Sequence, residues 1–238
     1  MTSSALDAVE EVPVWLEVNG VPAVTWMCTA DQLDALVVGW LHGEKYIETM
    51  DDIIRMRPCA QELGFWVDVA DDRYTAVERS ERRRVLASGC GAVTTILGAM
   101  SDVERRRGPI PEVDTAQMRL LFKELFGRGS RYKETGGVHA AALTDGTSLL
   151  YHAEDIGRHN AVDKVIGSAI LDGRTPHDLM LLVTGRISGE LAFKAARAQV
   201  ALVATPSVPS TIAVDIARAA KMALLGRAVS GQPQLHRP

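Results

Sequence analysis

The stretch "VLASGCGAVTTIL", residues 85–97, places Cys90 between two glycines in an otherwise apolar run. A thiolate is a strong nucleophile, and the flanking glycines give the backbone the freedom to move a reactive sulfur. Free cysteines are more often buried and inert, so a small hydrophobic side chain at a tight turn is the competing interpretation. The other two cysteines, Cys28 and Cys59, are too widely spaced to indicate a disulfide framework.

A second candidate site lies in "YHAEDIGRHNAVDKVIG", where charged side chains gather at the passage from a predicted strand to a predicted helix. The helix is predicted to begin near His159 or Asn160, and a helix N-terminus offers unpaired N–H groups to an anion. Arg158 adds a planar guanidinium that fits phosphate or carboxylate. The competing interpretation is a solvated loop with ordinary caps. Because loops after buried strands commonly bind ligands in α/β proteins, we favour a binding role.

Three further segments combine glycine or proline with polar residues. "VTGRISGELAFK" carries Arg186 and Ser188 after a buried-type strand, where a binding role and a plain helix cap are equally favoured. "ATPSVPSTIAVD" favours a rigid turn with Ser210 as a helix cap. In "KETGGVHAAAL", Gly137 would admit a ligand close to the backbone, and His139 would serve as an acid–base group or a hydrogen-bond donor. A lone histidine in an alanine-rich run is more often a core residue.

Several common motifs are missing from the sequence. There is no G-x-x-x-x-G-K-[ST] phosphate loop, no third glycine of a dinucleotide fingerprint after "GCG", and no C-x-x-C pair for structural zinc. His139 lies in a helix-like setting similar to the H-x-E motif of zinc nucleoside deaminases, but Ala141 replaces the catalytic acid. We therefore expect no metal site. A deaminase relative that binds a nucleotide stays a weaker alternative.

Hydrophobic spacing and turn residues predict the elements of the first half. Asn19-Gly20 predicts a hairpin, and Thr29 with Gln32 predicts a capping box at the start of a helix that ends near Gly43. Strands are predicted at 63–69 and 74–78. Asp114 is expected to cap a helix whose buried stripe is Met118, Leu121, Phe122 and Leu125.

The second half alternates strands with helices. Short apolar runs predict strands at 147–153, 178–184 and 200–205, and helical periodicity predicts helices at 160–173, 188–199 and 210–226. Such alternation indicates an α/β sheet with crossover helices.

Length and charge limit the functional classes. The chain has 238 residues and a formal net charge of −4, which gives no reason to expect a nucleic-acid partner. The first residues show no basic start followed by an apolar region, and no run of about 18 apolar residues predicts a membrane span. We expect a cytoplasmic protein without a membrane partner.

The segments quoted above together resemble one known family. "TGGVHAAAL", "AEDIGRHNAVDKVIG", "TGRISGELAFKAA" and "ATPSVPSTIAVDIA" match, in this order, signature stretches of the FdhD family, the formate dehydrogenase accessory sulfurtransferases. The early stretch "VNGVPAVTWMCTADQLDALVVGWLHGE" is also similar to that family's N-terminal region. The resemblance covers nearly the whole chain, and the ordered match is far more specific than any single motif.

The resemblance implies a mixed α/β fold, with a cytidine-deaminase-like α/β domain at 131–238 and a smaller N-terminal part, β-rich and helical, at 1–130. It implies a sulfur carrier that takes sulfur from a cysteine desulfurase and holds it as a persulfide on Cys90. The sulfur then goes to the bis-molybdopterin guanine dinucleotide form of the molybdenum cofactor, before this cargo enters formate dehydrogenase.

Members of the family are dimeric and hold the guanine nucleotide ends of the cofactor, so the resemblance also implies a homodimer that binds GDP. The cofactor-binding residues that it implies are Gly137, His139, Asp155, Gly157, Arg158, His159, Asn160, Arg186, Ser188, Arg227, Ala228, Val229, Ser230, Gly231 and Gln232. The C-terminal stretch matches its family counterpart poorly, because Arg227 stands where an aromatic residue is usual.

The chief departure from the family is at the candidate nucleophile. The family loop usually reads C-G-x-C-G, whereas this chain has Cys90 and then Val93 in place of the second cysteine. Two readings follow: Cys90 alone carries sulfur, or the protein is a cofactor-binding chaperone without catalysis. We favour the first, because a binding-only protein has no evident need for a cysteine at that position.

Overall fold

The N-terminal part of the molecule is built on a four-stranded sheet. The structure, a computed structural model, describes residues 8–78, 85–86, 93–94 and 103–238. The sheet has the order β2-β1-β4-β3, and its strands are β1 (Val12–Val18), β2 (Val21–Cys28), β3 (Ile53–Pro58) and β4 (Gly64–Val69). The predicted hairpin at Asn19-Gly20 is confirmed, since β1 pairs with β2 and both turn residues have positive φ, 48° and 77°, as a type I′ turn requires.

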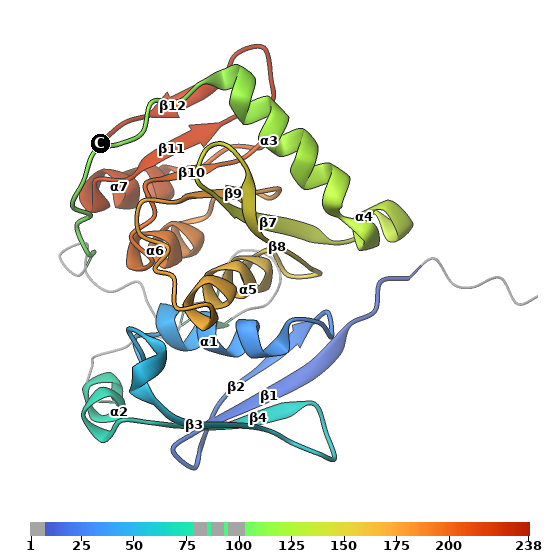
Figure 1. Ribbon diagram of the computed structural model, residues 1–238, viewed down its shortest axis with the longest axis vertical. Coiled ribbons are helices and arrows are strands. Elements are labelled where there is room, and N and C mark those ends of the chain that lie inside the picture. The colour runs from blue at the N-terminus through green and yellow to red at the C-terminus, as the bar shows by residue number, and fades with distance from the viewer. Residues whose placement is uncertain (1–7, 79–84, 87–92, 95–102) are drawn as a thin grey trace, which may run out of the picture.

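The C-terminal part is a six-stranded sheet in the order β12-β11-β10-β9-β7-β8. Its strands are β7 (His139–Thr144), β8 (Leu149–Asp155), β9 (Met180–Val183), β10 (Leu202–Ala204), β11 (Ala223–Gly226) and β12 (Gln234–His236). Helices α5 (Arg158–Leu171), α6 (Gly189–Arg197) and α7 (Thr211–Ala220) lie on one face, and α3 (Thr115–Arg128) lies on the other (Figure 1). The remaining elements are α1 (Leu33–Gly43), a 3₁₀ helix at Met50–Asp52, α2 (Asp71–Glu78), β5 (Val85–Leu86), β6 (Val93–Thr94) and α4 (Ser130–Thr135).

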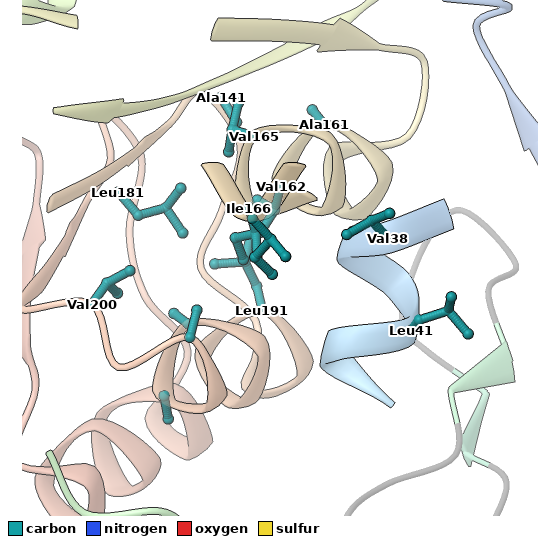
Figure 2. Packing of buried hydrophobic residues seen from close by; sticks show 14 of the residues in the cluster. Val38, Leu41, Ala141, Ala161, Val162, Val165, Ile166, Leu181, Leu191 and Val200 are labelled. Carbon is teal, nitrogen blue, oxygen red and sulfur yellow. The ribbon is translucent and has the colours of Figure 1, made fainter. Parts of the chain in front are cut away.

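Side-chain alternation along the strands of the second sheet divides the core between its two faces. Ala141 and Leu181 belong to the cluster that includes α5, α6 and α1 (Figure 2). The same cluster continues into the first sheet. Their neighbours Ala142 and Leu182 belong to the cluster under α3. The predicted stripe of α3, Met118, Leu121, Phe122 and Leu125, is buried there as expected.

Helices α1 and α5 join the two parts of the molecule, packing along much of their length (Figure 1). Glycine makes this approach close: a Cβ on Gly39 would overlap the backbone of Asp163, and a Cβ on Gly167 would overlap the backbone of Ala35. The backbones themselves are therefore in contact at the crossing, without side chains between them.

The predicted mixed α/β class is confirmed, but some local predictions are wrong. α1 begins at Leu33, after Gln32 in a left-handed conformation (φ 47°) that makes no side-chain cap, because Thr29 is bonded elsewhere. Residues 74–78 belong to α2, whose acidic first turn favours a helix. His139 begins β7 rather than lying in a helix, because pairing with β8 and β9 overrides the helix propensity of the alanines.

The second half follows the predicted alternation, with one more correction. The helical pattern at 210–226 ends early, because Lys221 has a left-handed conformation (φ 57°) and residues 223–226 form β11. The division of the chain at residue 130 stays a prediction, although α3 precedes it and packs on the second sheet. Within the described ranges, no helix is long and apolar enough to cross a membrane.

The α1–α5 contact predicts a large cost for one methyl group. Replacing Gly39→Ala forces the two backbones apart and should lower the free energy of unfolding by at least about 1–3 kcal/mol, as overpacking does. Gly127→Ala is the matched control, because its Cβ would meet nothing within 4 Å in α3 and should add up to about 1 kcal/mol. Urea denaturation measures both, and equal effects of the two substitutions would contradict the close crossing.

Candidate functional site

The segments singled out in the sequence gather where the carboxyl ends of most strands of the second sheet lie, which we call the carboxyl edge. β8 and β9 both run antiparallel to β7, while β9, β10 and β11 run parallel to one another. The carboxyl ends of β8, β9, β10 and β11 therefore lie at the same edge, together with the start of β7. The loops that leave this edge lead to α5, α6, α7 and β12 (Figure 1). This is the edge at which α/β proteins bind ligands.

His139, Arg158 and Gly185 meet at the centre of this edge. A Cβ on Gly185 would lie 3.2 Å from Cδ of Arg158 and 3.3 Å from the His139 ring. Thr184 fixes the start of β7, because its hydroxyl accepts a hydrogen bond of 3.0 Å from the Ala140 N–H. Thr205, after β10, donates to the Gly185 carbonyl at 2.7 Å. The structure thus brings together two predicted site residues, His139 and Arg158, that are far apart in the sequence.

A cavity of about 460 Å³ opens beside His139. This volume is within the range of small-molecule sites, about 300–1,000 Å³. Predicted residues Gly137 and His139 form part of its wall, and Glu154 brings a carboxylate that accepts the N–H groups of Arg131 and Tyr132 at 3.0 and 3.1 Å. The lining residues are Leu125, Phe126, Gly129, Tyr132, Gly136, Gly137, Val138, His139, Ala140, Glu154, Thr184 and Pro206.

Burial sets the charge of the two histidines at this edge. The pKa of His139 is lowered by burial and by the Arg158 guanidinium. The pKa of His159 is lowered to about 3, by burial first and then by Arg158, Lys194 and His139. His159 is therefore a neutral imidazole at neutral pH. Its Nε2 lies 3.2 Å from the hydroxyl of Ser188, which caps α6.

Asp155 and Lys164, both in the segment "AEDIGRHNAVDKVIG", form a buried group that we call the clamp. Asp155 and Lys164 are fully buried, and their side chains lie 2.7 Å apart. The Asp155 carboxylate also accepts the N–H groups of Gly157 and Thr29, and the amide of Asn160 at 2.9 Å. Asp155 and Asn160 are thus engaged within the protein, so their predicted role toward a cofactor would act through the backbone that they hold.

The clamp reaches the N-terminal part through Thr29. The Lys164 ammonium donates to the Thr29 carbonyl at 3.0 Å and to Asp31 at 2.7 Å, and the Ile156 N–H donates to the Thr29 hydroxyl at 3.1 Å. Asn160 donates to the Met27 carbonyl at 3.0 Å. Sequence reasoning missed Thr29 and Asp31 as partners of this segment, because they lie more than a hundred residues away along the chain and no local pattern marks the pairing.

The other predicted residues are arranged around the same edge. Gly157 is the N-cap of α5, Ser188 is the N-cap of α6, and Arg186, two residues before Ser188, is exposed. The stretch Arg227–Gln232 lies in the loop from β11 to β12 and is held by backbone bonds: Arg227 to Ser207 and Ala228 to Thr205. Ala228 is buried, whereas Val229 is exposed. Nothing in these contacts tests the predicted binding role of Val229, Ser230, Gly231 or Gln232.

The cysteines differ in what the structure says of them. Cys90 lies outside the described residues, and Val93 belongs to β6, which pairs antiparallel with β5. Cys28 is buried, and burial together with Asp155 raises its pKa to about 12, so it is a poor source of thiolate. Cys59 is partly exposed. In the part of the chain that is described, no group of three or more His, Cys, Asp or Glu side chains is arranged to hold a metal ion.

Comparison with known proteins extends to most of the chain. The sequence model of the FdhD/NarQ family matches residues 9–236. The Sulfur carrier protein FdhD of Bacillus subtilis (strain 168) is 32% identical over 221 residues, which cover 92% of this chain and 83% of that protein. The protein of the same name from Burkholderia mallei is 34% identical over 239 residues, covering 93% and 85% of the two chains.

A solved structure shares the fold. The crystal structure of a protein assigned as a formate dehydrogenase accessory protein, from Desulfotalea psychrophila, superimposes with a TM-score of 0.73 at 20% identity, over 96% of this chain and 87% of that one. At this identity the likeness concerns the fold alone. The match of the family model over nearly the whole sequence, together with relatives above 30% identity, shows that the chain belongs to the FdhD/NarQ family.

Proposed function

We propose that this protein is a sulfur carrier in the maturation of a formate dehydrogenase, with Cys90 as the group that carries the sulfur. The observation that carries the proposal is the family match over residues 9–236, with curated relatives named sulfur carrier proteins. The gathering of the signature segments at one sheet edge supports it, because a carrier must also hold its acceptor.

The loading step requires one thiol. The Cys90 thiolate attacks the outer sulfur of a persulfide on the donor, the donor's S–S bond breaks, and the donor cysteine leaves as a thiolate. A new S–S bond then holds the outer sulfur on Cys90. The donor of this proposal is a cysteine desulfurase. Val93 stands in place of the second thiol that would convert such a persulfide into an internal disulfide, so no neighbouring cysteine in the sequence discharges the loaded state.

The delivery step returns the thiolate. Cleavage of the Cys90 persulfide with two electrons from a thiol reductant releases the outer sulfur as sulfide and leaves Cys90 as a thiolate. The proposed acceptor is the bis-molybdopterin guanine dinucleotide form of the molybdenum cofactor, which is cargo and carries several phosphates. Arg158, the first turn of α5 and the neutral His139 supply hydrogen-bond donors suited to such an anion.

The protein works in the cytoplasm as a homodimer, between the desulfurase and a formate dehydrogenase, and the guanine ends of the cargo bind at the carboxyl edge of the second sheet. The cavity beside His139 supports this placement, because its Phe126 and Tyr132 offer aromatic surface to a base.

Persulfide loading is directly measurable. After incubation with a cysteine desulfurase and cysteine, intact mass spectrometry should show one added sulfur atom on the parent protein and none on Cys90→Ala. Cys59→Ala is the matched control and should load like the parent, because the sulfur resides on Cys90. Sulfur on Cys90→Ala, or an unloaded parent, would contradict the carrier role.

The alternative is a non-catalytic chaperone that only binds the cofactor, and it predicts that Cys90→Ser restores formate dehydrogenase activity to cells lacking their own accessory protein. The carrier role predicts that Cys90→Ser fails to restore this activity, whereas Cys59→Ser restores it. Full activity with a soluble, folded Cys90→Ser protein would favour the chaperone.

The binding edge predicts stabilisation by GDP. A ligand at 100 times its Kd adds about 2.7 kcal/mol to stability, which raises the melting temperature by several degrees. Arg158→Ala, and the exposed Arg186→Ala, should weaken GDP binding about tenfold or more, as loss of a charge-assisted hydrogen bond does. Arg218→Ala, on the exposed side of α7, is the control and should leave the shift unchanged. No shift with GDP at millimolar concentration would overturn the proposed edge.

A further inference from the structure

A histidine and a glutamate meet below the carboxyl edge, in a place that the proposed sulfur chemistry does not use. His159, in the first turn of α5, is 5% exposed. Its Nε2 lies 3.3 Å from Oε2 of Glu190, in the first turn of α6, whose side chain is 12% exposed. The hydroxyl of Ser188 lies 3.2 Å from the same nitrogen. Two titratable groups therefore share one buried contact between two helix N-termini.

The carboxyl group of Glu190 is not satisfied by its surroundings. Both of its oxygens are buried, and within the described residues neither makes an aligned hydrogen bond. A buried carboxylate without hydrogen-bond donors is costly, and protonation removes that cost. Burial accordingly raises the pKa of Glu190 to about 7. The group can exchange its proton in the neutral pH range.

The charged neighbours come from every element packed around the pair. Asp163 and Lys194, from α5 and α6, form a buried ion pair of 2.7 Å beside it. Arg158 of α5 and Glu44, which follows α1, also act on Glu190, while His139 of β7 acts on His159. Lys194 and Arg158 favour the ionised carboxylate, and Asp163 and Glu44 oppose it. These contributions leave burial as the largest influence on the Glu190 proton.

The pair is connected to the binding edge through Arg158 and His139. Arg158 precedes His159 in the chain and packs against Gly185 together with His139, which lines the cavity. An anion held at Arg158 and at the first turn of α5 would lie near the His159–Glu190 contact, because His159 follows Arg158 in that turn and Arg158 already acts on Glu190. A negative charge placed there disfavours a second negative charge on Glu190 and favours a proton on either member of the pair.

We propose that Glu190 is a positioning residue that holds a proton beneath the edge, and that an anionic ligand binds there with uptake of a proton into the Glu190–His159 pair. This inference rests on the anion-binding edge of the proposed function. The inference adds a condition to the proposed function: the cargo is held tightly while Glu190 is protonated and is repelled when this carboxylate is ionised. Proton release below the edge would then loosen the cargo.

The first test needs no ligand. Because the pKa of Glu190 in the folded protein lies above its ordinary value, its favourable contribution is complete at low pH and is lost as the pH rises through about 7. Glu190→Gln mimics the protonated group. It should melt at the same temperature as the parent near pH 5 and several degrees higher near pH 8.5. Glu112→Gln, at an exposed position, is the control and should show no such divergence.

The second test measures the coupling with GDP as the probe. If the ligand raises the pKa of the pair by one unit from about 7, GDP binding to the parent should weaken about sixfold between about pH 6.5 and pH 8.5, and more for a larger rise. In Glu190→Gln this additional weakening should disappear, so that the variant binds GDP more tightly than the parent at the higher pH. Calorimetry in buffers of different ionisation enthalpy should show proton uptake by the parent at pH 8 and less by the variant.

The outcomes separate the two proposals. Parallel pH profiles of melting for parent and variant would overturn the proton-holding role of Glu190. GDP binding with the same pH dependence in both proteins would overturn the coupling and leave the binding edge intact. Absence of GDP binding at every pH would overturn the edge itself and the coupling with it.

Discussion

The fully buried pair of Asp155 and Lys164 is the interaction on which the arrangement of this molecule depends. Lys164 reaches from α5 to Asp155 at the end of β8 and to the carbonyl of Thr29 after β2, so one ammonium group joins both sheets. Desolvating two charges is expensive, and a buried pair contributes little over a hydrophobic one of the same shape. Loss of one partner is different, because it leaves the other buried and charged. We infer that the pair fixes one geometry rather than adding net stability.

That geometry is reached because α1 and α5 approach each other closely. Glycines at the crossing let the backbones touch, which brings residues 27–31 within hydrogen-bonding distance of β8 and the first turn of α5. The same turn begins at the carboxyl edge and carries Arg158 and His159, which are both largely buried. The segment "EDIGRHNAVDK" thus combines two roles: Asp155, Asn160 and Lys164 hold the chain in place, and Arg158 packs beside Gly185 and His139 at the site.

Local patterns predicted much of this molecule, and the failures share one cause. The hairpin at Asn19-Gly20, the stripe of α3 and the caps at Ser188 and Ser210 depend on neighbours in the sequence, and the structure confirms them. The predictions for Thr29 and His139 are wrong because partners from distant parts of the chain decide their conformation. No pattern in the sequence singles out Glu190, since nothing local indicates that His159 and Asp163 lie beside it. The binding role of Arg227–Gln232 rests on family resemblance alone.

The central claim, that the Asp155–Lys164 pair holds the two parts in register, is tested by a double-mutant cycle on the free energy of unfolding. Lys164→Met alone should cost about 3–5 kcal/mol, because it leaves the buried Asp155 carboxylate without its positively charged partner. Adding Asp155→Asn to it should recover a large part of that loss, giving a coupling well above the few tenths of a kcal/mol seen between independent sites. A single substitution costing less than about 1 kcal/mol, or two costs that simply add, would contradict the claim.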